Sequence, residues 1–268
     1  MKQRWVYSVI LSFWIWTASG CVNEPSPVQP IVLEGIKLAD IMPTVSEQPP
    51  PVTSFLMTTY LVDQQQVAAL RVCMESFSTQ AFRYKAIKAF ESNGLFAAKG
   101  SGLQIHSLIE CFRQQGVRQI GQGRLAMNPG YELPFGAVAI SGSREITWVT
   151  ADNLETKTFL ANGTLCWLLK TQKDQYSPGR ILASVEPVFT PWTVQQLLEM
   201  DDFALKMAHR FDAGRFEALL RESDFMVLGP RHDSIDEFTE LERLLFVTPD
   251  ARTKFRMYVI VCVDAELE

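Results

Sequence analysis

The chain contains three histidines, His106, His209 and His232, and these are the first residues to consider as general bases or metal ligands. A helical zinc site would need two histidines in an H-x-x-x-H or H-E-x-x-H pattern, and the sequence has neither. The G-x-S-x-G motif of a serine nucleophile and the glycine-rich G-x-x-x-x-G-K phosphate loop do not occur either. We therefore assign no catalytic residue, no metal ligand and no cofactor from the sequence.

The densest group of polar residues surrounds the third histidine and contains Arg231, His232, Asp233, Asp236, Glu237 and Glu240. Carboxylates beside a histidine can bind a metal or transfer a proton. Pro230 precedes the group, however, and acidic residues are favoured at the N-terminus of a helix. We interpret this segment as a loop that leads into a helix.

The sequence Gly121-Gln122-Gly123 has the spacing of the first two glycines of a dinucleotide-binding loop. A third glycine at the required place and a following helical pattern are both missing. The motif therefore predicts a turn or a distortion within a strand.

Four cysteines are distributed through the body of the chain: Cys73, Cys111, Cys166 and Cys262. In an exported protein they can form two disulfides in any of three connectivities. Each also lies in an apolar stretch, where a free cysteine packs as a small hydrophobic residue. If a disulfide forms, Cys73 and Cys111 are the favoured pair, since both fall on predicted helices. No C-x-x-C is present, which disfavours a redox motif or a zinc ribbon.

The first twenty residues, 1–20, have the three parts of a secretory signal peptide. Lys2 and Arg4 give a positive start, and an uncharged apolar run extends from Trp5 to about Trp16. Small residues, Thr17 to Gly20, follow before Cys21. The apolar run is shorter than the roughly 20 residues that a membrane-spanning helix needs.

The sequence Ala18-Ser19-Gly20-Cys21 resembles the lipobox of bacterial lipoprotein precursors. In that family the cysteine thiol receives a diacylglycerol, and the signal is cleaved before the cysteine. The resemblance covers residues 1–21 only, and Ala18 stands where the family favours leucine. It implies lipidation at Cys21 and attachment to a membrane in the bacterial cell envelope. Val22, where the family's inner-membrane proteins have aspartate, implies the outer membrane, facing the periplasm or the cell surface. An ordinary signal peptide, with Cys21 left as a thiol, is the alternative.

Residues 21–52 contain seven prolines, at positions 25, 27, 30, 43, 49, 50 and 51. Proline fixes φ and removes a backbone donor, so the segment predicts a semi-extended tether behind the anchor. The globular region is expected to span residues 53–268. A break near 187–192 would separate two lobes of that region, and a single domain is equally compatible with the pattern.

Helical patterns come early and late in the globular region, with several antiparallel strands expected between them. Val67, Leu70 and Met74 fall on one helical face after a capping box of Asp63 and Gln66. Asn162-Gly163 between two apolar runs predicts a β-hairpin. Further helices are expected at 82–90, 103–112, 193–208 and 235–245, and further strands at 55–62, 95–98, 120–127, 136–140, 146–151, 157–160, 165–170, 181–189 and 255–263. Two more apolar segments, 216–220 and 225–228, are not assigned to either type. The order favours an α+β fold with a mixed, mainly antiparallel sheet and helices packed on one side.

The formal net charge of –5 disfavours a nucleic-acid partner, which would need clustered lysines and arginines. The sequence instead indicates a membrane partner through Cys21 and an envelope protein as a further partner. We expect a non-enzymatic binding or scaffolding module, and the alternative is an envelope hydrolase with a site assembled from distant residues. An apolar groove or exposed sheet edge would favour binding. A histidine near both a carboxylate and a nucleophile would favour hydrolysis.

Overall fold

The computed structural model describes residues 52–174, 179–193, 196, 207–248 and 251–265. Residues Gln48–Glu268 form one compact unit, to which all of the following refers. The signal peptide, Cys21, the tether and most of the helix expected at 193–208 lie outside the described residues. Among the described residues, no helix is both long enough and apolar enough to cross a membrane.

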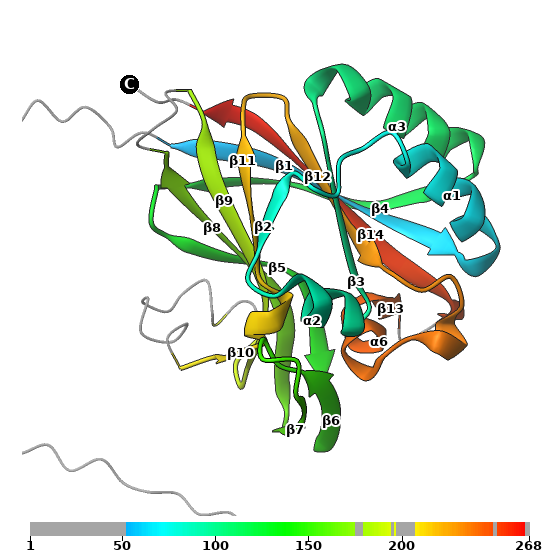
Figure 1. The fold of residues 1–268 in the computed structure, drawn as a ribbon, viewed down its shortest axis with the longest axis vertical. Helices are drawn as coiled ribbons and strands as arrows, with labels where there is room; N and C mark the ends of the chain where they lie inside the picture. The colour runs from blue at the N-terminus through cyan, green and yellow to red at the C-terminus, as the bar shows by residue number, and fades with distance from the viewer. Residues whose placement is uncertain (1–51, 175–178, 194–195, 197–206, 249–250, 266–268) are drawn as a thin grey trace, which may run out of the picture. The chain divides into compact units, whose positions relative to one another are not determined.

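Two antiparallel sheets dominate the fold (Figure 1). Sheet A contains, in order across the sheet, β3 (Leu95–Gly100), β12 (Phe225–Pro230), β14 (Ala251–Ala265), β1 (Thr53–Asp63) and β4 (Arg118–Met127), with β13 (Val247–Thr248) paired to β14. Sheet B contains β2 (Phe82–Tyr84), β11 (Phe216–Leu220), β9 (Ile181–Thr190), β8 (Gly163–Lys173) and β5 (Glu132–Ile140), with β10 (His209–Arg210) paired to β9. The strands β6 (Arg144–Val149) and β7 (Glu155–Leu160) form a separate two-stranded ribbon. The expected antiparallel pairing is confirmed, and strands predominate more strongly than the sequence suggested.

The described helices are short: α1 (Val67–Met74), α2 (Ile87–Ser92), α3 (Gly102–Gln114) and α6 (Glu240–Phe246), with 3-10 turns η2 (Gln64–Gln66), η3 (Asp212–Gly214) and η4 (Ile235–Glu237). Helix α3 packs on one face of sheet A, where Phe112 contacts Tyr60 of β1 edge to face. Helix α6 packs on the opposite face, where Phe246 contacts Tyr258 of β14. Helices therefore cover both faces of sheet A, whereas the sequence pattern suggested helices on one side.

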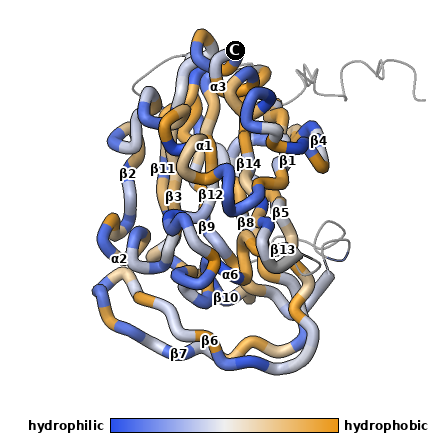
Figure 2. Tube along the Cα trace, turned by 90° about the vertical axis from the view of Figure 1, so that its right-hand side faces the viewer, coloured by the Kyte–Doolittle hydropathy of each residue, from blue (hydrophilic) through white to orange (hydrophobic). Residues whose placement is uncertain are grey.

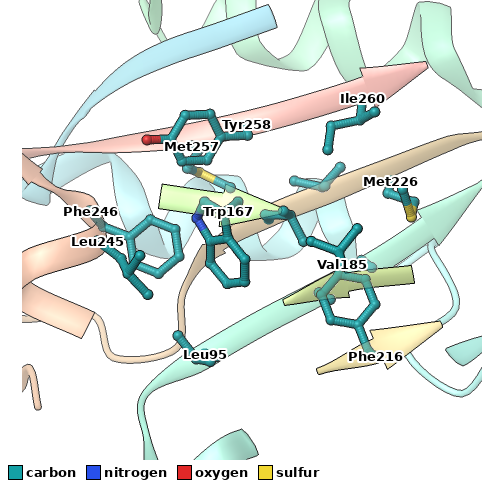
Figure 3. Packing of buried hydrophobic residues seen from close by; sticks show 14 of the residues in the cluster. Leu95, Trp167, Val185, Phe216, Met226, Leu245, Phe246, Met257, Tyr258 and Ile260 are labelled. Atoms are coloured by element: carbon teal, nitrogen blue, oxygen red, sulfur yellow. The ribbon is translucent and has the colours of Figure 1, made fainter. Parts of the chain in front are cut away.

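The main core lies between sheets A and B (Figure 3). Trp167 of β8 is the largest fully buried side chain, and its ring centroid lies 6.0 Å from that of Phe246. Phe246 in turn lies 6.3 Å from Tyr258, so α6 links the two sheets through an aromatic column. Apolar burial of this extent is the dominant stabilising term in folding.

The local patterns at the start of the globular region are confirmed. Asp63 and Gln66 form the predicted capping box, in which the Asp63 N–H donates to Gln66 Oε1 at 2.9 Å. The buried residues of α1 are the three that the helical spacing selected, Val67, Leu70 and Met74. In α3 the stripe is only partly buried, because Leu108 is in the core whereas Leu103 is 93% exposed.

The glycine pair in β4 marks a strand distortion, as predicted. Thr59 of β1 faces Gly121 and the next residue, Tyr60, faces Gln119, so Ile120 is an extra residue on β4. One extra residue on one strand of an antiparallel pair is a β-bulge, and it bends the strand locally.

The hairpin predicted around Asn162-Gly163 is wrong. Strand β7 pairs with β6, whereas β8 pairs with β5 and β9. Asn162 Oδ1 accepts a hydrogen bond from the Gly142 N–H at 2.6 Å, so it ties two loops together. Glycine is needed at 163 because a Cβ there would lie 2.2 Å from the Thr190 carbonyl oxygen. Glycine is therefore required at 163 by the close approach of the Thr190 backbone, and not by a positive φ at residue 163.

The helical spacing predicted from Phe82 to Phe90 is also wrong in its first part. Phe82 lies in the strand β2, and α2 begins only at Ile87. Phe82 packs against Phe216 of β11 with ring centroids 5.0 Å apart. Pairing with β11 therefore decides the conformation of this segment, which tertiary context can do when propensity is weak.

The ribbon of β6 and β7 has hydrophobic and hydrophilic residues in succession (Figure 2). Ile146, Trp148 and Leu160 are buried on its inner face. On the outer face Phe159 is 68% exposed. The alternation is that of a half-buried strand pair, and it anchors the ribbon to the main core through one face only.

Candidate binding groove

A groove opens at the β3 edge of sheet A, between α1 and the segment that contains β2 and α2. Its volume is about 510 Å³. Buried apolar side chains make up most of its wall, among them Leu70, Met74, Phe77, Phe90, Leu95 and Met257. Most ligand sites in proteins are concave, largely apolar and between about 300 and 1,000 Å³ in volume. The groove meets each of these criteria.

Helix α1 forms one wall of the groove and is held by α3. The structure joins Cys73 of α1 to Cys111 of α3 in a disulfide, with their Cα atoms 6.3 Å apart. Gln66, just before α1, also donates to the Gln115 carbonyl oxygen at 2.7 Å, which ties the start of α1 to the end of α3. The wall that carries Leu70 and Met74 is thus fixed at both ends.

The rim of the groove carries both signs of charge, from Arg71, Glu75, Glu91 and Arg231. Arg71 is paired with Asp233 at 2.6 Å, and Arg231 is paired with Glu91 at 2.8 Å. Both arginines therefore already have carboxylate partners. The rim does not present an unpaired positive charge to an anionic ligand.

Tyr84 places a polar atom among the apolar side chains of the groove. Its hydroxyl donates to the Thr79 carbonyl oxygen at 3.4 Å. Burial, aided by the negative charge of Glu91, raises the pKa of the Tyr84 phenol far above its ordinary value. The hydroxyl is therefore neutral at physiological pH.

The edge of β3 that faces the groove has no partner strand alongside Leu95 and Ala97 among the described residues. On this side β3 makes a single bridge, in which Ser78 and Lys99 exchange two backbone hydrogen bonds of 3.0 Å. Backbone groups alternate between the two sides of a strand, so those of Leu95 and Ala97 point in the same direction as those of Lys99. On the other side, the Arg231 N–H donates to the Gly94 carbonyl at 2.8 Å, as this alternation requires.

The polar group around His232 is placed partly as the sequence suggested. Ser234 begins η4, which contains Asp236 and Glu237, and Glu240 opens α6. Asp233 forms a salt bridge with Arg71. These side chains do not assemble into a metal site, and the described residues contain no cluster of three metal-ligating groups.

Glu242 is the partner of His232, and the sequence analysis did not select it. Its carboxylate is fully buried and accepts from His232 Nδ1 at 2.7 Å, from the His232 N–H at 3.0 Å and from the Thr239 N–H at 3.1 Å. Burial raises the pKa of the Glu242 carboxyl, and the His232 and Thr239 hydrogen bonds oppose that rise. The T-x-x-E capping box from Thr239 to Glu242 was the signal in the sequence that could have found it. Among the described residues, no hydroxyl or thiol hydrogen bonds to the His232 ring.

None of the three histidines is among the residues that line the groove. His106 is exposed on α3. His209 of β10 packs edge-on against Phe211 and Trp148, with ring centroids 4.8 and 5.9 Å away. The structure does not bring the three histidines together.

Burial lowers the pKa of His209 below its ordinary value, although Asp212 acts in the opposite direction. The folded state therefore favours the neutral ring. The contribution of the neutral His209 ring to the stability of the fold is fully present above the unfolded pKa of about 6.5. It is lost as the pH falls through the lowered pKa of the folded state. We expect the melting temperature of the His209→Gln variant to approach that of the wild type as the pH falls from 7.5 to 5.5. Thermal denaturation at several pH values tests this, and a constant difference would contradict it.

Arg210 on sheet B binds two carboxylates at once. It lies 2.6 Å from Glu186, which is buried, and 2.7 Å from Glu132. We expect Arg210→Met to lower the free energy of unfolding by about 2 to 3 kcal/mol, because the buried Glu186 loses its cationic partner and Glu132 keeps only Lys170, at 3.5 Å. Arg113→Met, which removes an exposed pair with Glu110, is the control and should leave urea denaturation unchanged. Equal effects of the two variants would argue against this role.

The two remaining cysteines of the globular region are buried, Cys166 in β8 and Cys262 in β14. Burial raises the pKa of the Cys166 thiol to about 12. A thiol in this state is a poor nucleophile, because the thiolate is the reactive form.

Comparisons with known proteins add no assignment to this geometry: no protein-family model, no curated protein and no solved structure matches the chain.

Proposed function

We propose that the protein is a membrane-anchored envelope lipoprotein that acts as a non-enzymatic binding module, with the groove beside α1 as its ligand site. The observation that carries the binding function is the groove itself. It combines about 510 Å³ of space, a largely apolar wall and two rim arginines that each have a carboxylate partner. Burial of apolar ligand surface in such a site contributes about 25 cal/mol per Å².

The anchor part of the proposal rests on the sequence alone. A lipid on Cys21 and a proline-rich tether over residues 21–52 would hold the binding module near the outer membrane, facing the periplasm or the cell surface. Two or more acyl chains are enough for stable attachment, since each buried CH₂ contributes about 0.8 kcal/mol. Mass spectrometry of the mature amino terminus should show Cys21 with a diacylglycerol. An unmodified Cys21 or cleavage at another residue would contradict the anchor and leave the groove untouched.

Occupation of the groove can be tested with an apolar fluorescent probe, 8-anilinonaphthalene-1-sulfonate. We expect the full mature chain with Cys21→Ser to bind it, and Thr79→Trp to reduce binding by about tenfold. Thr79 is an exposed residue of the rim, so an indole there can fill the groove without repacking the core. Gln122→Trp, on the strand at the opposite edge of sheet A, is the matched control. If both variants bind as the parent does, the groove is not the site.

The contact between His232 and Glu242 favours one alternative, an envelope hydrolase. A buried carboxylate that orients a histidine is two thirds of a nucleophilic triad. Hydrolysis of p-nitrophenyl acetate, abolished by His232→Gln while the fold is retained, would support this alternative. Equal and negligible rates for the two proteins would reject it.

A further inference from the structure

A second, smaller pocket lies between β5, the start of β6 and α6. Its volume is about 300 Å³, at the lower end of the range for ligand sites in proteins. It shares no lining residue with the groove beside α1. Val138 and Ile140 of β5 are buried in its wall, and Leu244 and Val247 are half-buried there. The pocket can therefore receive a short apolar group.

Two arginines, Arg144 and Arg243, and Ser141 form the polar part of the same wall. Within the described ranges, neither arginine forms a salt bridge with a carboxylate. The groove differs in this respect, because Arg71 and Arg231 each have a carboxylate partner. The smaller pocket therefore presents two guanidinium groups that can accept an anionic ligand.

The polar groups of the pocket are held in place by the elements around them. Arg243 Nη2 donates to the Ile235 carbonyl oxygen at 2.8 Å, which fixes the side chain and leaves other guanidinium donors for a ligand. The loop 141–143 between β5 and β6 is tied down by the Gly142 N–H, which donates to Asn162 Oδ1 at 2.6 Å. A site that is already ordered loses less entropy when a ligand binds.

We propose that this pocket binds an organic phosphate that carries a short apolar substituent. Guanidinium groups bind phosphate through short, charge-assisted hydrogen bonds, often in pairs. A phosphate monoester carries about two negative charges at neutral pH, which matches the charge of the two arginines. The Ser141 hydroxyl can donate a further hydrogen bond, and the substituent would contact Leu244 and Val247. The site goes beyond the proposed function, because it is separate from the groove.

Isothermal titration calorimetry of the full mature chain with Cys21→Ser and hexyl phosphate tests the proposal. Hexanol lacks the charge and inorganic phosphate lacks the apolar part. We expect each to bind at least about tenfold more weakly than hexyl phosphate, since a charged hydrogen bond or a buried alkyl chain is worth that much or more. The proposal is overturned if hexyl phosphate does not bind, or if either control binds as tightly.

Replacement of Arg144 tests the site from the protein side. Arg144 is exposed and its side chain has no partner among the described residues, so Arg144→Gln should fold normally. We expect it to weaken hexyl phosphate binding about tenfold, and Arg144→Lys to restore part of the loss. Arg118→Gln is the matched control, because Arg118 is also exposed and also begins a strand, β4. Equal losses in Arg144→Gln and Arg118→Gln would show unspecific attraction and overturn the site.

The groove variant Thr79→Trp separates the two sites. It should leave hexyl phosphate binding unchanged, because Thr79 does not line the smaller pocket. A loss of binding in this variant would place the phosphate in the groove and overturn the second site. Failure of the anilinonaphthalene probe to bind would concern the groove alone.

A soluble phosphate ester and the phosphate headgroup of a membrane lipid present the same chemistry to the pocket. Sedimentation with phosphatidylcholine vesicles, with and without phosphatidic acid, distinguishes the two sources. Sedimentation that requires both phosphatidic acid and Arg144 would support the site with a lipid as its ligand. Binding of hexyl phosphate without sedimentation would support the site with a soluble ester as its ligand. If neither hexyl phosphate nor the vesicles bind, the proposal is wrong.

Discussion

Removing the disulfide between Cys73 and Cys111 should lower the free energy of unfolding by about 4 kcal/mol. The two cysteines are 38 residues apart in the sequence. Closing a loop of this length restricts the unfolded chain by about that amount in the chain-entropy description. For a protein of this size, the loss corresponds to a fall of roughly 10 °C in melting temperature. Thermal and urea denaturation of the Cys73→Ala, Cys111→Ala double variant measures both quantities.

Dithiothreitol provides the control for the disulfide. It should lower the stability of the wild type to that of the double variant and leave the double variant unchanged. The effect should extend to the groove, because α1 carries Leu70 and Met74 and would lose its link to α3. We therefore expect weaker binding of the anilinonaphthalene probe in the double variant. A wild type whose melting temperature does not respond to dithiothreitol would show that the bond is absent.

Replacing Gly94 with alanine should destabilise the protein by about 3 to 5 kcal/mol. Gly94 follows α2 with a φ of +74°, and a Cβ there would lie 2.0 Å from Glu242 Oε2. The buried carboxylate would have to move and leave the N–H groups of His232 and Thr239 without their acceptor. Each unsatisfied buried group costs about 1 to 3 kcal/mol, and the left-handed backbone adds about 1 kcal/mol.

Gly116 is a matched control for Gly94. It also follows a helix, α3, with a φ of +70°, but the nearest atom to its Cβ position is Gln66 Nε2 at 3.6 Å. Gly116→Ala should therefore cost only about 1 kcal/mol, the conformational part. In a double-mutant cycle, Gly94→Ala and Glu242→Ala together should cost less than the sum of the single variants. Additive costs, or equal costs at the two glycines, would contradict the role of the Glu242 carboxylate.

Much of the fold could be predicted where a residue's conformation depends on its neighbours in the sequence. The capping box at Asp63 and the buried face of α1 both depend on contacts within a few residues, so the sequence was enough to predict them. The strands β1, β9 and β14 were also recognised, because each has a continuous or alternating run of apolar residues.

The pairing of strands could not be read in the same way. Asn162-Gly163 has the composition of a hairpin turn, yet Gly163 is required by the Thr190 backbone, which is distant in the sequence. Phe82 has helical spacing relative to Phe90, but its contact with Phe216 places it in a strand. Such contacts depend on which segments meet in space, and apolar periodicity is nearly the same for several arrangements.

Composition and short-range spacing are enough to propose the anchor at Cys21 and the tether, and they correctly predicted the capping box at Asp63 and the buried face of α1. Tertiary structure alone decided the groove, whose walls come from α1, β3, α2 and β14, and the buried partner of His232, which lies ten residues away on α6. The physical reason is that a binding surface is made by side chains from distant segments. Its shape is set by how two sheets and their covering helices pack, which no local pattern records.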